Sequence, residues 1–172
     1  CTQLEMLTAG VPHKIANLAN AAALLWQQLP DINWAGFYLM TDGMLVLGPF
    51  QGKPACTRIA VGRGVCGTAV AQDATQLVPD VHAFPGHIAC DCASNSEIVV
   101  PIHKNGAVYG VLDIDSPLLN RFTEADREGL EALVQVLASK NLGLNQRLDI
   151  ASRRTTRDKL MAYLLSQAKL AG

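Results

Sequence analysis

Cysteine and carboxylate side chains are the residues of this sequence best suited to chemistry. Cysteines stand at positions 1, 56, 66, 90 and 92. Glu97 precedes one apolar segment, and Asp113 and Asp115 end the next one. A thiolate attacks an oxidised substrate, a carboxyl group with a raised pKa donates a proton to the departing oxygen, and a second thiol resolves the product as a disulfide. These residue types therefore indicate thiol redox chemistry.

The same residues also have structural interpretations. A buried cysteine often acts only as a small hydrophobe, and an aspartate at a strand end commonly forms a turn. A zinc site is a further alternative, because His82, His87, Cys90 and Cys92 offer nitrogen and sulfur ligands within one short segment. Their spacing matches no standard zinc-finger pattern, so we expect no metal.

The apolar periodicity predicts an α+β fold with a central, mainly antiparallel sheet between N- and C-terminal helices. The predicted helices span residues 13–28, 65–71 and 122–137. The predicted strands span residues 34–40, 44–47, 57–60, 98–102 and 107–114.

The turn at Asn105-Gly106 makes the last two predicted strands neighbours. Glu97 and the two aspartates then converge at one end of the sheet. Residues 78–95, which include Cys90, are predicted to form a long loop beside that end, and such loops usually serve as lids or binding loops.

The length and composition predict one globular domain rather than a disordered or membrane protein. The 172 residues are 49% apolar and 17% charged, which suffices for a core without metals or disulfides. The most apolar stretch, 15–26, is too short to cross a bilayer, and no signal-peptide pattern is visible. An odd number of cysteines in such a chain argues against a disulfide framework, and we expect a cytoplasmic protein.

Six collinear motifs within residues 5–138 resemble the free methionine-(R)-sulfoxide reductases. The motifs are DINWAGFYL (31–39), LVLGPFQGKPAC (45–56), VGRGVCGTAV (61–70), DVHAFPGHIACD (80–91), SNSEIVVPI (94–102) and GVLDIDS (110–116). Members of that family are GAF-fold enzymes that reduce free, not protein-bound, methionine sulfoxide. The resemblance implies the same fold and activity here.

The resemblance also implies roles for the cysteines. Cys90 matches the nucleophile that attacks the sulfoxide sulfur and becomes a sulfenic acid. Cys56 matches the resolving cysteine that forms the disulfide, and Cys66 matches a third family cysteine that serves as an alternative disulfide partner. Cys92 departs from the family, which usually has a small residue without a thiol there, and we expect it to have no role.

The remaining roles concern the substrate. Glu97, Asp113 and Asp115 match the carboxylates that hold and protonate the sulfoxide oxygen. Trp34 and Tyr38 match the aromatic wall around the S-methyl group, and their spacing of four residues puts both on one face of a strand. The resemblance implies that thioredoxin reduces the disulfide and that no bound cofactor is needed.

Residues 139–172 are predicted to form a helical extension beyond the catalytic domain of residues 1–138. Residues 146–172 carry a net charge of +4, whereas residues 1–145 carry −5. The end of the chain, NLGLNQRLDIASRRTTRDKLMAYLLSQAKLAG (141–172), resembles part of transcription regulators of the cyclic-AMP-receptor class. Apolar residues at 4-3 spacing over 130–151 are typical of a dimeric coiled coil, although packing of this helix on the body is the alternative. We expect a homodimer, and no nucleic-acid binding, because no recognition helix follows.

Two functions are consistent with these patterns. One is a thioredoxin-dependent reductase of free L-methionine (R)-sulfoxide. The other is a non-catalytic GAF sensory module that binds a ligand in the same pocket and signals through the helical extension. The sequence favours the enzyme, because a binding module has no need of the thiols and carboxylates together.

Overall fold

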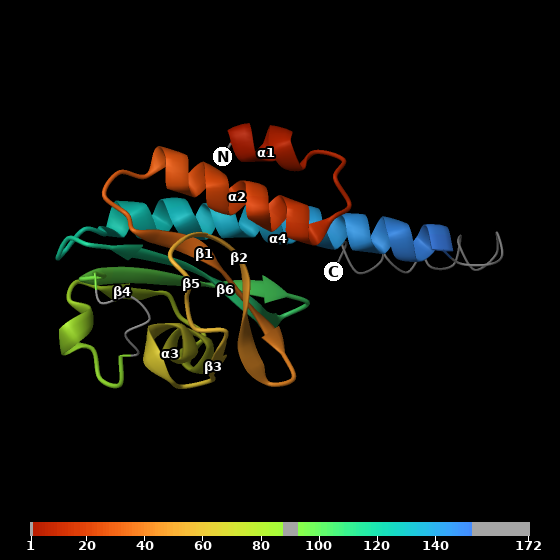
Figure 1. The fold of residues 1–172 in the computed structure, drawn as a ribbon. Helices are drawn as coiled ribbons and strands as arrows, with labels where there is room; N and C mark the ends of the chain where they lie inside the picture. Colours follow the sequence, from red (N-terminus) through yellow and green to blue (C-terminus); the bar gives the residue numbers. More distant parts are fainter. Residues whose placement is uncertain (1, 88–92, 153–172) are drawn as a thin grey trace.

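The computed structural model describes residues 2–87 and 93–152, with side chains up to Ser139 (Figure 1). Cys90, Cys92 and the part of the predicted extension beyond Ser152 therefore lie outside the described residues. None of the helices in the described ranges has the length and apolarity that a membrane span requires.

A six-stranded antiparallel sheet forms the centre of the molecule, in the order β3-β2-β1-β6-β5-β4. The elements in chain order are α1 (Thr2–Thr8), α2 (Lys14–Gln28), β1 (Trp34–Thr41), β2 (Met44–Gly52), β3 (Arg58–Ala60), α3 (Gly64–Gln72), β4 (Gln76–Val78), the 3₁₀ helix η1 (Val81–Ala83), β5 (Ser96–Lys104), β6 (Ala107–Ser116) and α4 (Glu124–Ser152). The predicted α+β class with a mainly antiparallel sheet is confirmed.

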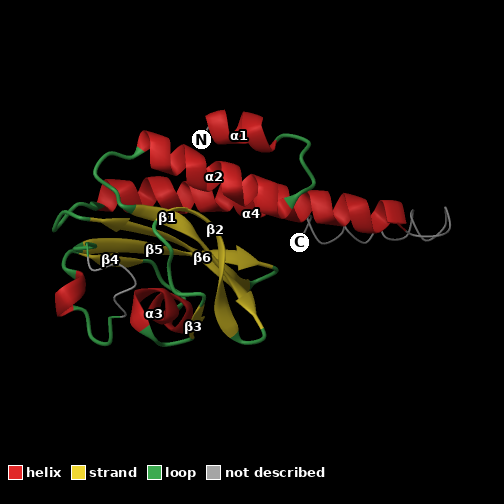
Figure 2. Ribbon diagram, viewed as in Figure 1, coloured by secondary structure: helices red, strands yellow, loops and turns green. Residues whose placement is uncertain are grey.

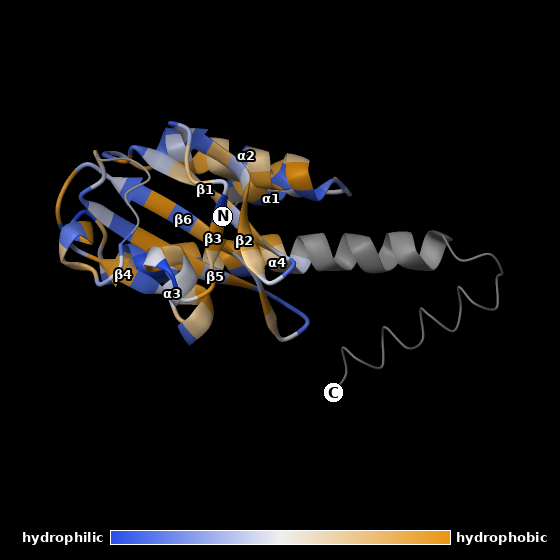
Figure 3. Ribbon diagram, turned by 60° about the horizontal axis from the view of Figure 1, so that its bottom comes forward, coloured by the Kyte–Doolittle hydropathy of each residue, from blue (hydrophilic) through white to orange (hydrophobic). Residues whose placement is uncertain are grey.

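Helices cover both faces of the sheet (Figures 1 and 2). Helices α1, α2 and α4 form a layer over one face, and α3 lies against the other. Successive side chains of a strand point to opposite faces, so β6 sends Leu112 and Ile114 to the core under α2 and α4, and Val111 to the core under α3. The central strands are accordingly strongly apolar (Figure 3). The polar residues between these apolar positions are not needed for the core and can form a functional site.

The hairpin between β5 and β6 forms as predicted. Asn105 has φ of +53° and Gly106 φ of +78°, the left-handed pair that a tight hairpin turn requires. Helix α4 starts after Thr123, whose Oγ1 accepts a hydrogen bond from the Asp126 N–H at 3.3 Å, as expected of an N-cap. Helix α4 then continues to Ser152, without a break between the helix predicted over 122–137 and the helical extension predicted from 139 onward.

Several elements differ from the prediction. Strand β2 runs to Gly52 rather than ending at 47, because a bulge in its pairing with β1 between Gly36 and Tyr38 accommodates Gly48 and Pro49. The prediction missed three further elements, which are short: α1, β4 and η1. Elements of three to seven residues show too few repeats for a periodicity to be detected.

Candidate active site

Strand pairing brings the three predicted carboxylates together. Glu97 on β5 lies directly opposite Asp115 on β6, and Asp113 lies two positions away on the same face of β6. Trp34 on β1 pairs with Asp115 from the other side, and Gly36 pairs with Asp113. The predicted convergence of Glu97, Asp113 and Asp115 at one end of the sheet is confirmed.

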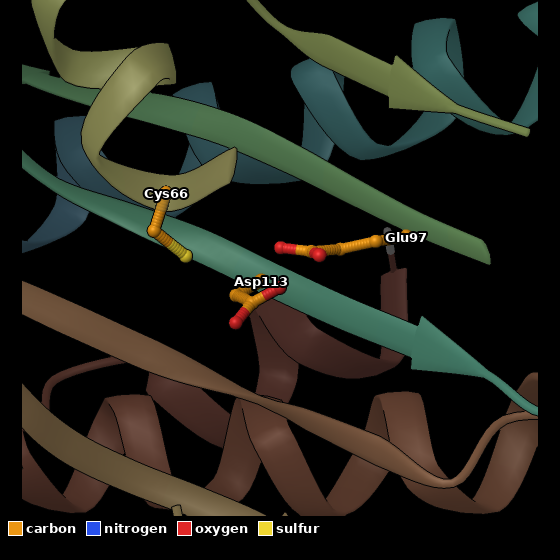
Figure 4. A group of neighbouring side chains, drawn as sticks. All are labelled: Cys66, Glu97 and Asp113. Atoms are coloured by element: carbon orange, nitrogen blue, oxygen red, sulfur yellow. The ribbon is translucent and has the colours of Figure 1, made fainter. Parts of the chain in front are cut away.

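Helix α3 adds a thiol to this end of the sheet. The Sγ atom of Cys66 and carboxylate oxygens of Glu97 and Asp113 all lie within 4.8 Å of one another. Figure 4 shows the three side chains pointing toward one another from α3, β5 and β6. Cys66 is 4% exposed, and Glu97 and Asp113 are each 6% exposed, so the cluster is shielded from bulk water.

The carboxylates and aromatic residues line a single pocket. It contains about 550 Å³ of empty space when its open mouth is included. Six of the eight predicted site residues line it: Trp34, Tyr38, Cys66, Glu97, Asp113 and Asp115. Cys56 is not among the lining residues, although its neighbours Pro54 and Ala55 are. Cys90 is outside the described residues.

Burial controls the protonation of the cluster. It raises the pKa of Asp113 to about 6, a rise that hydrogen bonding with Cys66 and Glu97 limits. Burial, followed by the charges of Asp113 and Asp115, raises the pKa of Glu97 well above its usual value. Burial and the charges of Asp113 and Glu97 likewise raise the pKa of the Cys66 thiol. Burial thus favours the protonated forms of these carboxyl groups, as a proton donor to a departing oxygen requires.

The two aromatic residues of the pocket wall, Trp34 and Tyr38, belong to a stack of three rings, whose third member, Phe50, is not among the lining residues. Trp34 stacks on Phe50 with ring centroids 5.3 Å apart and on Tyr38 at 5.9 Å. The stack depends on Gly36, because a Cβ there would lie 2.3 Å from the Cβ of Phe50 and 2.6 Å from the Trp34 ring. Phe50 was not predicted from the sequence, since only its pairing with Gly36 identifies it as the residue that supports Trp34.

Two residues of the aromatic wall also form hydrogen bonds with the segment that carries Cys56. The Trp34 indole N–H donates a hydrogen bond to the carbonyl of Lys53 at 3.1 Å. The Tyr38 hydroxyl donates one to the carbonyl of Cys56 at 3.0 Å. Cys56 is disulfide-bonded, whereas Cys66 is free.

Two further pocket residues, Arg63 and His87, were not predicted to bind substrate. His87 was considered only as a metal ligand, beside His82. Burial and then the neighbouring His82 lower the pKa of His87, which favours its neutral form. The ring of His82 is 3.0 Å from the side-chain oxygen of Asn95, so it fastens the start of the loop to its end.

Within the described residues, the group of ligands close enough to hold a metal ion is Cys66, Glu97 and Asp113. It differs from the zinc alternative of the sequence, which also involves Cys90 and Cys92 outside the described residues. All three pKa values are raised, so a metal ion would have to displace protons from these groups. The arrangement therefore favours proton transfer over metal binding.

The chain is similar to proteins of a known family. The chain matches the GAF domain family over residues 11–140. It is 61% identical over 131 residues to the free methionine-R-sulfoxide reductase of Escherichia coli, covering 76% of this chain and 79% of that protein.

Solved structures give the same result. The reduced form of fRMsr of Staphylococcus aureus is 53% identical, with a TM-score of 0.80 over 81% of this chain and 91% of that one. The free methionine-R-sulfoxide reductase of Neisseria meningitidis in complex with its substrate is 46% identical, with a TM-score of 0.82 over 85% and 88%.

Proposed function

The chain belongs to the GAF-domain family and, within it, to the free methionine-R-sulfoxide reductases, and from this membership we infer that it reduces free L-methionine (R)-sulfoxide to methionine. The chain is an oxidoreductase. The observation that carries this function is the pocket itself, where buried carboxyl groups with raised pKa values face an aromatic wall. A sulfoxide has a basic oxygen and an apolar S-methyl group, and the pocket offers a partner for each.

We propose that Cys90 is the nucleophile. Its thiolate attacks the sulfoxide sulfur, and a proton from Glu97 passes to the sulfoxide oxygen. The oxygen is transferred to the Cys90 sulfur, so the substrate gains two electrons and leaves as methionine while Cys90 is oxidised to a sulfenic acid. Once the oxygen carries this proton, it donates hydrogen bonds to Asp113 and Asp115, and Trp34 contacts the S-methyl group.

Cys56 is proposed as the resolving thiol. Its thiolate attacks the Cys90 sulfenic acid, a disulfide forms and water leaves. The disulfide-bonded state of Cys56 supports this role, as does the fastening of its segment to the pocket wall by Tyr38. Thioredoxin then supplies two electrons and returns both thiols. Such a cycle operates in a reducing compartment, for which we propose the cytoplasm.

The alternative of a sensory module fits the site less well. A binding module has no need of both a buried carboxyl group that favours its protonated form and a disulfide-forming cysteine. The family membership and the acid cluster both favour catalysis.

The function is tested by NADPH consumption with thioredoxin, thioredoxin reductase and each sulfoxide epimer separately. We expect consumption with the R epimer of free methionine sulfoxide and a much slower reaction with the S epimer and with a peptide containing methionine sulfoxide. Binding of the R epimer without NADPH consumption would support the sensory module instead.

We also propose that the chain forms a homodimer. The layer of α1 and α2 exposes large apolar side chains, among them Met6 (69% exposed), Ile15 (58%) and Trp26 (39%). Sedimentation equilibrium should show a dimer that Ile15→Glu converts to monomer, because a buried unpaired charge destabilises an apolar interface. A monomeric wild-type chain at all concentrations would exclude this assembly.

The proposed domain division places residues 1–138 in the catalytic domain and residues 139–172 in a helical extension. Helix α4 is continuous from Glu124 to Ser152, so the proposed boundary falls inside one helix. The first turns of the extension are thus a direct continuation of the catalytic domain.

A further inference from the structure

The buried cluster of Cys66, Glu97 and Asp113 contains more acidic groups than it can ionise. The three groups lie within 4.8 Å of one another and each is at least nine-tenths buried. Two buried carboxylates at such a distance share a proton, because the repulsion of two negative charges is little screened there. The cluster therefore has one ionised carboxyl group at most near neutral pH, and its neighbours decide which one.

The groups that face this cluster come from several elements. Arg63 at the start of α3 and His87 of the loop are the basic groups among the described lining residues, and Tyr38 and Asp115 complete the titratable ones. Arg63 is exposed, and His87 has a lowered pKa. Neither provides a buried positive charge, so hydrogen bonds within the cluster determine where the proton resides.

Asp113 occupies the central position in this cluster. A carboxylate oxygen of Asp113 lies within 4.8 Å of both the Cys66 sulfur and a Glu97 carboxylate oxygen. Hydrogen bonding with these two groups limits the rise in the pKa of Asp113 and adds to the rise in the pKa values of Cys66 and Glu97. A carboxylate that accepts two hydrogen bonds is stabilised relative to the carboxyl group. The second oxygen of Asp113, Oδ1, is buried without a hydrogen-bond partner, which leaves one acceptor on this carboxylate for a bound substrate.

We propose that Cys66 takes part in the reaction as a hydrogen-bond donor to Asp113, and not as a redox thiol. Its S–H group holds Asp113 as the ionised carboxylate and thereby keeps the transferable proton on Glu97. Cys66 is thus a positioning residue that acts through Asp113. The inference rests on the proposed reductase function and specifies how its acid is maintained.

The structure gives two arguments against a redox role for Cys66. The thiol is 4% exposed and its pKa is raised, whereas attack on a sulfenic acid requires a thiolate. Oxidation of Cys66 would also remove the S–H donor from Asp113. The transferable proton would then no longer be held on Glu97 in each catalytic cycle.

Two variants of Cys66 separate the alternatives. Cys66→Ser and Cys66→Ala both lack sulfur, but only serine retains a donor at this position. We expect Cys66→Ala to lower kcat by roughly three- to tenfold, the effect of one hydrogen bond, and to shift the alkaline limb of the pH profile of kcat. We expect Cys66→Ser to restore most of the lost rate and the wild-type pH profile. A redox thiol or a purely structural cysteine predicts instead that the two variants have the same pH profile, and that result would overturn the proposal.

A spectroscopic measurement tests the donor directly. The infrared difference spectrum between the wild type and Cys66→Ala isolates the S–H stretch of Cys66. We expect this band to lie at a frequency typical of a hydrogen-bonded thiol and to move toward the free value in Asp113→Asn. A Cys66 band that does not respond to Asp113→Asn would contradict the proposal. If the wild type itself fails to reduce the sulfoxide, the proposed function fails, while these spectra still report on the hydrogen bond.

Discussion

Replacing Cys90 with serine is expected to lower methionine formation by about 1,000-fold or more, because a serine hydroxyl at this position lacks both the nucleophilicity and the oxidation chemistry of a thiolate. The carboxylates and the aromatic wall remain in this variant, so substrate binding should be retained. A loss of turnover with retained binding distinguishes a nucleophile from a residue that shapes the pocket.

The matched control is Cys92→Ala. Cys92 lies two residues from Cys90 in the sequence, and a disulfide between cysteines so close together is strained. We therefore expect turnover within about twofold of the wild type. Both variants are assayed by methionine release under single-turnover conditions, which do not depend on thioredoxin. An equal loss of activity in both variants would mean that the two thiols act together and that the assignment of Cys90 alone is wrong.

Replacing Glu97 with glutamine should separate catalysis from stability. Glutamine has a similar shape but supplies no proton, so we expect kcat to fall by about 100-fold or more, which is typical for the loss of a general acid. The same change should stabilise the fold at alkaline pH. Burial of Glu97 beside Asp113 and Asp115 raises its pKa, and ionisation of such a group in the folded state is unfavourable.

The direction of the stability change follows from proton linkage. A carboxyl group with a raised pKa in the folded state binds more protons when folded than when unfolded, so stability falls as the pH rises from its unfolded pKa toward its folded one. For Asp113 this window runs from 3.8 to about 6, and for Glu97 it starts at 4.5 and extends upward. Thermal melts should therefore show Glu97→Gln gaining more stability over the wild type at pH 8 than at pH 4.

Glu131→Gln serves as a control, because it should change the stability at pH 8 in the opposite direction to Glu97→Gln. A hydrogen bond from Thr75 lowers the pKa of Glu131, so its ionised form stabilises the folded protein above its unfolded pKa and this stabilisation is lost as the pH falls. Glutamine at 131 should accordingly reduce stability at pH 8 and have little effect on kcat. If Glu97→Gln changed Tm equally at both pH values, the raised pKa of Glu97 in the folded protein would be contradicted.

Much of the site could be predicted because it depends on local signals. The turn at Asn105-Gly106 specifies the pairing of β5 with β6, and this pairing alone brings Glu97 opposite Asp115. The alternation along β1 likewise specifies that Trp34 and Tyr38 share a face. Each of these features is determined by residues close together in the sequence.

The remaining features depend on packing between distant segments. The contact of Cys66 with the carboxylates arises because α3 lies against the sheet (Figure 4), and nothing in the sequence of α3 specifies that placement. Gly48 and Pro49, which form the bulge of β2, interrupt the strand pattern in the sequence, so Phe50 was not recognised as the residue that stacks behind Trp34. The substrate and its stereochemistry came from family resemblance, since carboxylates and thiols alone specify a reaction type.

The most direct test of the mechanism is a single turnover of Cys56→Ser with excess free methionine (R)-sulfoxide, followed by a sulfenic-acid-specific label and mass spectrometry. Trypsin leaves Cys66, Cys90 and Cys92 in one peptide, because Lys104 is the next cleavage site after Arg63, so the label must be placed by fragmentation. The mechanism predicts one methionine released per chain and one label, on Cys90. A label on Cys66 or Cys92, or methionine release without any labelled cysteine, would contradict it.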